Sequence, residues 1–126
     1  MSRSPVIPAG EPDQDMWSDP ATGLLCRARR SPLDHWCGYV AVPPHLVDFM
    51  GDAYVDCDVH GGVTFAGSAV PLEGADYWIG FDCGHPSDLV PGMRYIIPGA
   101  VYRDLAFVHR QCAKIAAYVA GFEYRH

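Results

Sequence analysis

The sequence predicts an α+β fold with two layers, in which a mainly antiparallel sheet is packed by one long C-terminal amphipathic helix. Short runs rich in aromatic and β-branched residues, separated by Gly and Pro, occupy the chain from 24 to 83, as is typical of strands joined by turns. After a loop over 84–100, apolar residues recur at intervals of four and three, which indicates one buried helix face. This stripe consists of Val101, Leu105, Val108, Cys112, Ile115 and Val119.

The first half of the chain predicts a hairpin followed by a short helix. Residues 24–29 and 36–42 have the composition of strands, and the segment 30–34 between them supplies turn residues. Residues 43–50 predict a helix, because Pro stands at its start and Gly51 follows its end.

The middle of the chain predicts a second hairpin and one further strand. Residues 53–60 and 63–67 are the expected strands, since Gly61 and Gly62 between them tolerate the positive φ of a tight turn. Residues 76–83 are rich in aromatic and β-branched side chains and predict another strand.

Length and composition predict one folded domain over 23–126, preceded by a flexible Pro-rich arm over 1–22. The net charge of −6 and the single short Arg cluster exclude a nucleic-acid-binding face. No apolar run approaches the roughly 20 residues of a membrane span, and no export signal is visible, so a cytoplasmic protein is expected. The five cysteines show no Cys-x-x-Cys spacing and are expected to be reduced thiols.

Strand alternation sorts the polar residues of 53–60 into a candidate site and a core position. Asp56, Asp58 and His60 would share one face of a strand, while Cys57 would face the core. Two carboxylates and an imidazole suit a divalent cation or acid–base work, although exposed strand faces are also often acidic. His60 carries the most weight, because the bare backbone of the following Gly61-Gly62 lets a ligand approach closely.

The same rule separates the residues of the last strand and the loop after it. Phe81 and Cys83 would face the core, whereas Trp78, Gly80 and Asp82 would share the opposite face. The flat gap at Gly80 suits either a stacked ligand ring or a neighbouring backbone. Two further polar residues, His85 and Asp88, lie at the start of the loop that follows this strand.

Zinc ligation and nucleophilic catalysis are two possible roles for the thiols of Cys37 and Cys83, besides a structural one. His35, Cys37, Cys83 and His85 could supply four ligands to zinc, but only one residue separates each pair, which is short for a zinc knuckle. Cys83 could act as a nucleophile with a His partner, but its acidic neighbours do not favour a thiolate. Small buried hydrophobes are the simpler interpretation of both cysteines.

The start of the long helix offers an anion site or a helix cap. Arg103 beside a helix N-terminus is suited to a phosphate or carboxylate, while Asp104 in the first turn is explained by the helix dipole alone. Both interpretations remain open for this end of the helix.

Four segments occur in a fixed order: LDHWCGYVAVP (33–43), DVHGGVTFAG (58–67), YWIGFDCGHPSD (77–88) and YRDLAFVHRQCAKIA (102–116). Together they resemble a family of small uncharacterised proteins found in bacteriophages and some bacteria, over roughly 24–120. The resemblance implies an accessory protein made in the cytoplasm of an infected bacterial host, and it assigns no catalytic residue. Such accessory proteins include inhibitors of host defence that sequester nucleotide signals, which is an analogy from context.

These observations favour a protein that binds a small phosphate- or nucleotide-like molecule without a resident metal or cofactor. Aromatic side chains would stack on a base, and Arg103 with the Gly61-Gly62 backbone would hold the phosphate. A homodimer is an expected form, because two copies can share a deeper site across a two-fold axis. The expected ligand-binding residues are Trp36, Tyr39, His60, Gly61, Gly62, Trp78, Asp82, His85, Asp88 and Arg103.

Two other classes of function stay open alongside the binding protein. The first is a metal-dependent hydrolase, and the second is a protein–protein inhibitor of a host factor. The binding protein is preferred to an enzyme because the chain carries no strong catalytic motif. The hydrolase would use some subset of Asp56, Asp58, His60, Asp82 and His85.

Overall fold

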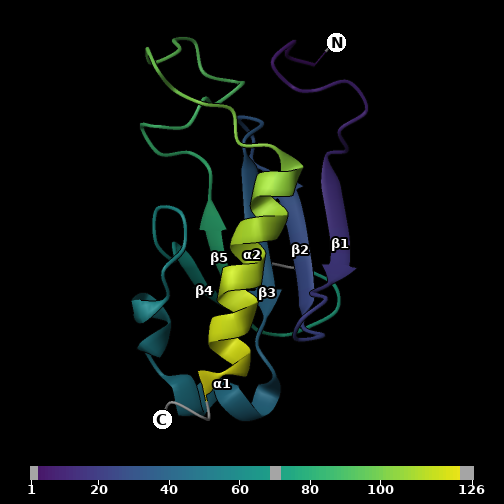
Figure 1. The fold of residues 1–126 in the computed structure, drawn as a ribbon, viewed down its shortest axis with the longest axis vertical. Helices are drawn as coiled ribbons and strands as arrows, with labels where there is room; N and C mark the ends of the chain where they lie inside the picture. Colours follow the sequence, from purple (N-terminus) through teal and green to yellow (C-terminus); the bar gives the residue numbers. More distant parts are fainter. Residues whose placement is uncertain (1–2, 69–71, 123–126) are drawn as a thin grey trace.

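The computed structural model describes residues 3–68 and 72–122, and these form a five-stranded sheet with one long helix against it (Figure 1). The strand order is β1-β2-β3-β5-β4, and every neighbouring pair is antiparallel. The predicted α+β class is therefore confirmed. The strands are β1 (Gln14–Ser18), β2 (Leu25–Arg30), β3 (Trp36–Ala41), β4 (Phe65–Gly67) and β5 (Trp78–Asp82).

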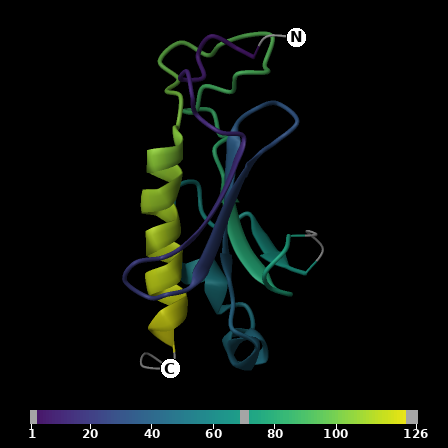
Figure 2. The same cartoon turned by 90° about the vertical axis from the view of Figure 1, so that its right-hand side faces the viewer.

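The long helix α2 (Leu105–Ala120) lies along one face of the sheet (Figure 2). The predicted apolar stripe is confirmed from Val108 onward, but Val101 lies outside the helix and is exposed. The helix begins later than the stripe because the Asp104 side chain accepts the Phe107 backbone N–H at 2.9 Å and caps it. The stripe packs on a buried sheet face made by Cys26, Ala28, Trp36, Val40, Ile79, Phe81 and Cys83.

Gly38 in β3 allows α2 to approach the sheet closely. A Cβ at this position would lie 2.5 Å from the Phe81 ring and 2.9 Å from the Cys112 sulfur. The sheet and helix therefore meet at van der Waals distance, and the fold holds the N-terminus of α2 at a fixed place over β3.

The opposite face of the sheet is also buried, which the alternation pattern alone does not reveal. Tyr39, Ala41, Leu72 and Trp78 form a second apolar cluster there. The Tyr39 ring fills the gap predicted beside Trp78, since a Cβ on Gly80 would lie 2.6 Å from Tyr39 Cδ1. The alternation predicted which side chains share a face, but this second face does not offer a free stacking platform.

The first 22 residues differ from the flexible arm that the sequence predicts. Gln14–Ser18 form the edge strand β1, which pairs with β2 along its whole length. The Trp17 ring stacks on His109 of α2 with ring centroids 3.7 Å apart, and Asp15 pairs with His109 at 2.8 Å. The prolines that indicate a loose segment lie outside these five residues, so the composition of the whole segment hides a short strand.

The segment 53–60 is not the strand that its alternation predicts. The helix α1 (Pro44–Met50) is present as expected, but Ala53–Asp56 form the 3₁₀ helix η1, and β5 pairs with β4 instead. Cys57 and Val59 are nevertheless buried as the alternation predicts. Val55, which the alternation places on the same face, is 66 % exposed because it lies on η1. Alternation therefore identified only part of the buried set.

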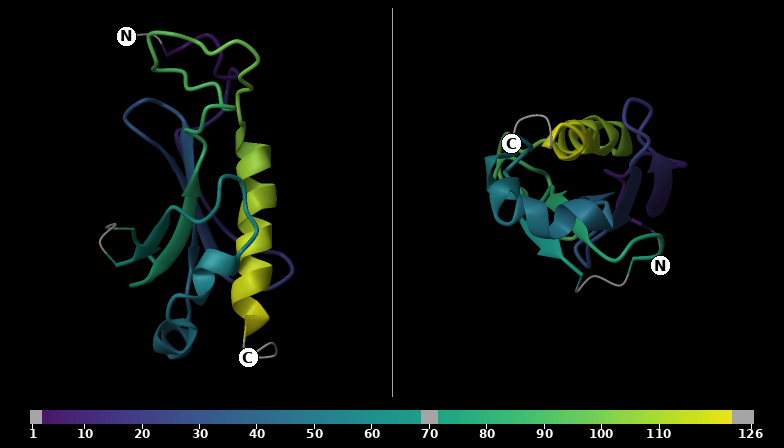
Figure 3. Two further views of the ribbon diagram at one scale, coloured as in Figure 1. Left: turned by 90° about the vertical axis from the view of Figure 1, so that its left-hand side faces the viewer. Right: turned by 90° about the horizontal axis from the view of Figure 1, so that it is seen from below.

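Different segments of the chain lie at the two ends of the molecule. The loop over 83–104 and the N-terminal segment gather at one end, while α1 and the C-terminal end of α2 lie at the other (Figures 1 and 3). Across residues 3–68 and 72–122, the structure contains no helix with the length and apolar character needed to cross a membrane.

Candidate functional site

Polar residues from three segments converge beside the N-terminal end of α2. Asp82 ends β5, and His85 and Asp88 follow it in the loop. His60 comes from the turn after η1, and Arg103 stands just before α2. The contacts among these five residues, which we call the His–Asp–Arg cluster, bring together side chains that are far apart in the sequence.

Asp88 is the centre of the His–Asp–Arg cluster, and its side chain is 0 % exposed. Its carboxylate accepts hydrogen bonds from His60 Nε2 at 2.9 Å, from Arg103 Nε at 2.8 Å and from the His85 backbone N–H at 3.0 Å. Burial alone would raise the pKa of Asp88, but these donors outweigh it and lower the pKa below its ordinary value. Asp88 is therefore an ionised internal anchor and not a surface that faces a ligand.

Each of the two imidazoles faces one carboxylate, and the rings lie edge to face with centroids 5.6 Å apart. His85 Nε2 lies 2.9 Å from Asp82 Oδ1, although the contact does not have hydrogen-bond geometry. Ionised Asp88 can only accept, so His60 Nε2 carries the hydrogen and Nδ1 is the nitrogen left for other partners.

Two residues of α2 that the sequence does not mark as functional hold His60 in place. Gln111 accepts the His60 backbone N–H at 2.9 Å, and the Phe107 ring meets the imidazole edge to face at 5.0 Å. The Arg103 guanidinium also lies over Phe107, at 5.0 Å from the ring centre. Phe107 and Gln111 are four residues apart, so helical spacing after Arg103 was the available signal.

Gly61 lets the two imidazoles lie side by side. Its φ is +69°, and a Cβ on it would lie 2.0 Å from His85 Nε2. The Gly62 backbone N–H closes the turn on the Val59 carbonyl at 2.8 Å, and Val59 is buried in the core. The Gly-Gly pair thus serves a turn as predicted, but this turn positions a polar cluster and does not join two strands.

Replacing Gly61 by Ala is expected to displace His85 from Asp82, because the added Cβ occupies the position of the imidazole. We also expect a loss of about 1–2 kcal/mol from the left-handed backbone. Gly62→Ala is the matched control, since its φ is +79° but no atom lies within 4 Å of the added Cβ. Imidazole NMR resonances should move for His85 in Gly61→Ala alone; equal changes in both variants would contradict the steric account.

The three aromatic residues predicted as a stacking surface are not available to a ligand. Trp36 and Trp78 are fully buried, and Tyr39 is buried over Gly80. These predictions were wrong because the sheet is covered on both faces, so large aromatic side chains serve the core.

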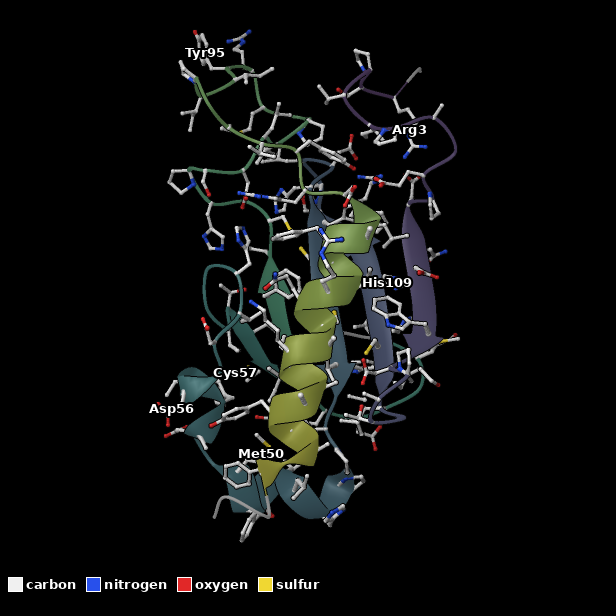
Figure 4. All side chains as sticks on the ribbon, viewed as in Figure 1. Arg3, Met50, Asp56, Cys57, Tyr95 and His109 are labelled. Carbon is white, nitrogen blue, oxygen red and sulfur yellow. The ribbon has the colours of Figure 1, made fainter. Side chains whose placement is uncertain are left out.

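The structure brings together only part of the residue set proposed for a metal-dependent hydrolase. His60, Asp82 and His85 lie in the His–Asp–Arg cluster, whereas the two remaining carboxylates do not. Asp56 is exposed on η1 at the α1 end of the molecule, and Asp58 is exposed on the segment that follows (Figure 4). The shared face with His60 is lost because 53–60 is not a strand. Within the described ranges, no three His, Cys, Asp or Glu side chains are grouped as metal ligands.

The surroundings of Cys37 and Cys83 disfavour the thiolate. Burial, followed by the charge of Asp88, raises the pKa of Cys83 far above its ordinary value. Burial, followed by the charge of Asp82, raises the pKa of Cys37 to about 11. A nucleophile needs the thiolate, so these surroundings oppose nucleophilic chemistry and fit the structural interpretation of both cysteines.

An unpredicted network centred on Glu11 occupies the N-terminus of α2. The Glu11 carboxylate accepts hydrogen bonds from Arg30 at 2.8 Å, from the Trp36 indole at 3.0 Å and from the Tyr102 hydroxyl. Its second oxygen accepts the Leu105 backbone N–H at 3.0 Å. The anion expected at this helix end is therefore a side chain of the protein itself.

Acidification is expected to destabilise the protein below about pH 4 through Asp88 and Glu11. Burial alone would raise the pKa of Glu11 as well, but hydrogen bonds from Tyr102, Leu105, Trp36 and Arg30 lower it. Both folded-state pKa values lie below their unfolded values. The stabilisation is thus complete above the unfolded values and is lost as the pH falls through the folded ones. Urea unfolding between pH 7 and 3 measures it; an unchanged profile in Asp88→Asn/Glu11→Gln would contradict the assignment.

Two cavities differ sharply in their relation to the cluster. One of about 170 Å³ is lined by His85 and Asp88 together with apolar residues of the following loop. The other, of about 610 Å³, lies at the ends of β2 and β3 beside α1, and its lining is mostly apolar, with Asp76 as the charged residue. The smaller cavity is the one that joins the polar cluster.

No family model, no curated protein and no solved structure matches this chain. The interpretation of the cluster therefore rests on its geometry.

Proposed function

We propose that the protein binds a small phosphate-bearing molecule of the nucleotide-like class at the His–Asp–Arg cluster. The observation that carries the proposal is the way Asp88 holds Arg103. Asp88 uses only the Nε of the guanidinium, at 2.8 Å, and within residues 3–68 and 72–122 the two terminal nitrogens make no hydrogen bond. A guanidinium held at its base with its fork free is suited to a phosphate or carboxylate.

Three nitrogen atoms near Arg103 also lack a hydrogen-bond partner within the described residues. They are His60 Nδ1, His85 Nδ1 and the nitrogen of the Gly61 backbone N–H. Both oxygens of Asp88 are used by internal donors. Asp88 is turned inward, whereas Asp82 stays partly exposed, and the free Nδ1 of His60 is an acceptor when Nε2 carries the hydrogen. The donors left for an anionic ligand are therefore the Arg103 fork and the Gly61 N–H.

The biological role that we attach to this site is sequestration. The resemblance to bacteriophage proteins suggests an accessory protein that removes a nucleotide-like signal of host defence. The absence of an assembled acidic cluster at Asp56 and Asp58 supports a binding protein over a metal-dependent hydrolase.

Isothermal titration calorimetry tests the proposal with inorganic phosphate, pyrophosphate, ADP-ribose and a cyclic dinucleotide. Binding of at least one of them is expected, with a loss of about tenfold or more in Arg103→Gln, since a charged hydrogen-bond partner contributes about 1.5–3 kcal/mol. Arg110→Gln is the matched control, because Arg110 also lies near the Phe107 ring, at 6.0 Å, but has no contact with Asp88. No heat with any ligand, or equal losses in the two variants, would refute the site.

A further inference from the structure

The cavity beside the His–Asp–Arg cluster has one polar wall and one apolar wall. The polar wall is formed by His85, with the buried Asp88 behind it. Arg103 does not line the cavity but adjoins it, since its Nε bonds to Asp88 at 2.8 Å. The apolar wall is formed by the loop that follows Asp88. Its side chains there include Leu89, Val90, Met93, Tyr95, Ile96 and Ile97.

Several of these apolar side chains are exposed, although the base of the loop is fixed. Tyr95 is 78 % exposed and Ile96 is 60 % exposed. Asp88 and Val101 form a parallel bridge, with Leu89 N–H donating to Val101 C=O at 2.8 Å and Gly92 N–H donating to Leu33 C=O at 2.8 Å. A contiguous apolar group held in one place at a cavity mouth is typical of a binding site.

We infer that the ligand is amphiphilic, with one phosphate or carboxylate group held at the cluster and an aromatic or short aliphatic body packed against Met93, Tyr95 and Ile96. The inference rests on the proposed function and specifies its ligand class. The body replaces water at exposed apolar side chains, and the anionic group is expected beyond His85 on the side of Arg103, whose terminal nitrogens are free of hydrogen bonds within the described residues. Tyr95 provides the aromatic surface that Trp36, Tyr39 and Trp78 cannot provide, because these are buried.

The size of the cavity limits what the apolar body can be. At about 170 Å³ it is smaller than the roughly 300–1,000 Å³ of pockets that enclose drug-sized ligands. It therefore takes a single ring or a short chain, and any remaining part of a larger ligand lies outside. The loop at one end of the molecule leaves room for this, since Tyr95 points away from the sheet and helix (Figure 4).

A series of ligands with one anionic group and different bodies tests the inference by calorimetry. The series is inorganic phosphate, phenyl phosphate, butyl phosphate, benzoate and adenosine monophosphate. We expect phenyl phosphate to bind at least about tenfold more tightly than inorganic phosphate, because its ring is removed from water. In Tyr95→Ala/Ile96→Ala, this preference should disappear while the affinity for inorganic phosphate is unchanged. Benzoate against phenyl phosphate separates a carboxylate head from a phosphate head.

Val55→Ala is the matched control for the loop variant. Val55 is also a large exposed apolar residue, at 66 % exposure, but it lies on η1 and lines neither cavity. Its substitution should leave the preference for phenyl phosphate intact. If inorganic phosphate binds but no body improves the affinity, the amphiphilic ligand is refuted and the anion site stands. If no member of the series binds, both are refuted.

Discussion

Replacing Asp88 by Asn is expected to lower the free energy of unfolding by about 3 kcal/mol and to abolish anion binding. Three donors converge on the buried carboxylate, from His60, Arg103 and the His85 backbone. An amide can accept at one oxygen only, so its NH₂ group must face at least one donor. The substitution also leaves the Arg103 charge without its partner.

Asp82→Asn is the control for this change. Asp82 belongs to the same cluster, but its side chain is 35 % exposed and its ion pair is with His85. A loss below about 1 kcal/mol is expected for such a partly exposed pair. Urea denaturation at pH 7 compares the two variants, and equal stabilities would show that Asp88 is not the anchor described above.

Replacing Glu11 by Ala is expected to cost about 3–4 kcal/mol, because it removes the buried partner of a buried cation and leaves Arg30 only the exposed carboxylate of Asp13. The Arg30 side chain is 5 % exposed, it bonds to Glu11 at 2.8 Å, and it lies over the Trp36 ring at 4.3 Å. Glu11 also holds the first backbone N–H of α2 through Leu105. The substitution therefore loosens the N-terminal segment, β2 and the start of α2 together.

Asp13→Ala is the matched control, since Asp13 bonds to the same Arg30 through Nε at 2.9 Å but is 76 % exposed. It should cost less than about 1 kcal/mol. Thermal or urea unfolding gives the two values, and limited proteolysis should cut the N-terminal segment faster in Glu11→Ala alone. Equal effects of the two substitutions would contradict the central role of Glu11.

The parts of the fold that were predicted correctly depend on repeated local patterns. The apolar stripe from Val108 to Val119 and the strands around Val40 and Phe81 each have several residues that indicate the same periodicity. The segment 53–60 was assigned wrongly because alternation reports burial and not pairing. The five-residue strand β1 was missed because its neighbours are rich in Pro and its own pattern is short.

The candidate site was predictable to the extent that polar residues gather at turns and element ends. His60, Asp82, His85, Asp88 and Arg103 were named from such positions, and the structure brings them together. Which of these five residues forms the buried centre was not predictable, because Asp88 is buried only through contacts from three separate segments.

Two other features depend on tertiary packing and have no local signal. Trp36 and Trp78 were expected at a ligand, yet both faces of the sheet are covered and each is buried. Glu11 was not named at all, because a single Glu in a Pro-rich segment gives no indication that Arg30, Tyr102 and the α2 N-terminus will surround it.

The central claim is that His60, His85 and Arg103 form a ligand site and not only a structural network. Side-chain NMR of protein labelled with ¹⁵N at His and Arg, titrated with pyrophosphate, tests it most directly. His109 is an internal control, since it also pairs with a carboxylate but lies on α2 against Asp15 and Trp17 of β1. For a ligand site, the His60, His85 and Arg103 resonances are expected to shift along one saturable curve while His109 stays fixed. Shifts that do not saturate, or that are equal at His85 and His109, would contradict it.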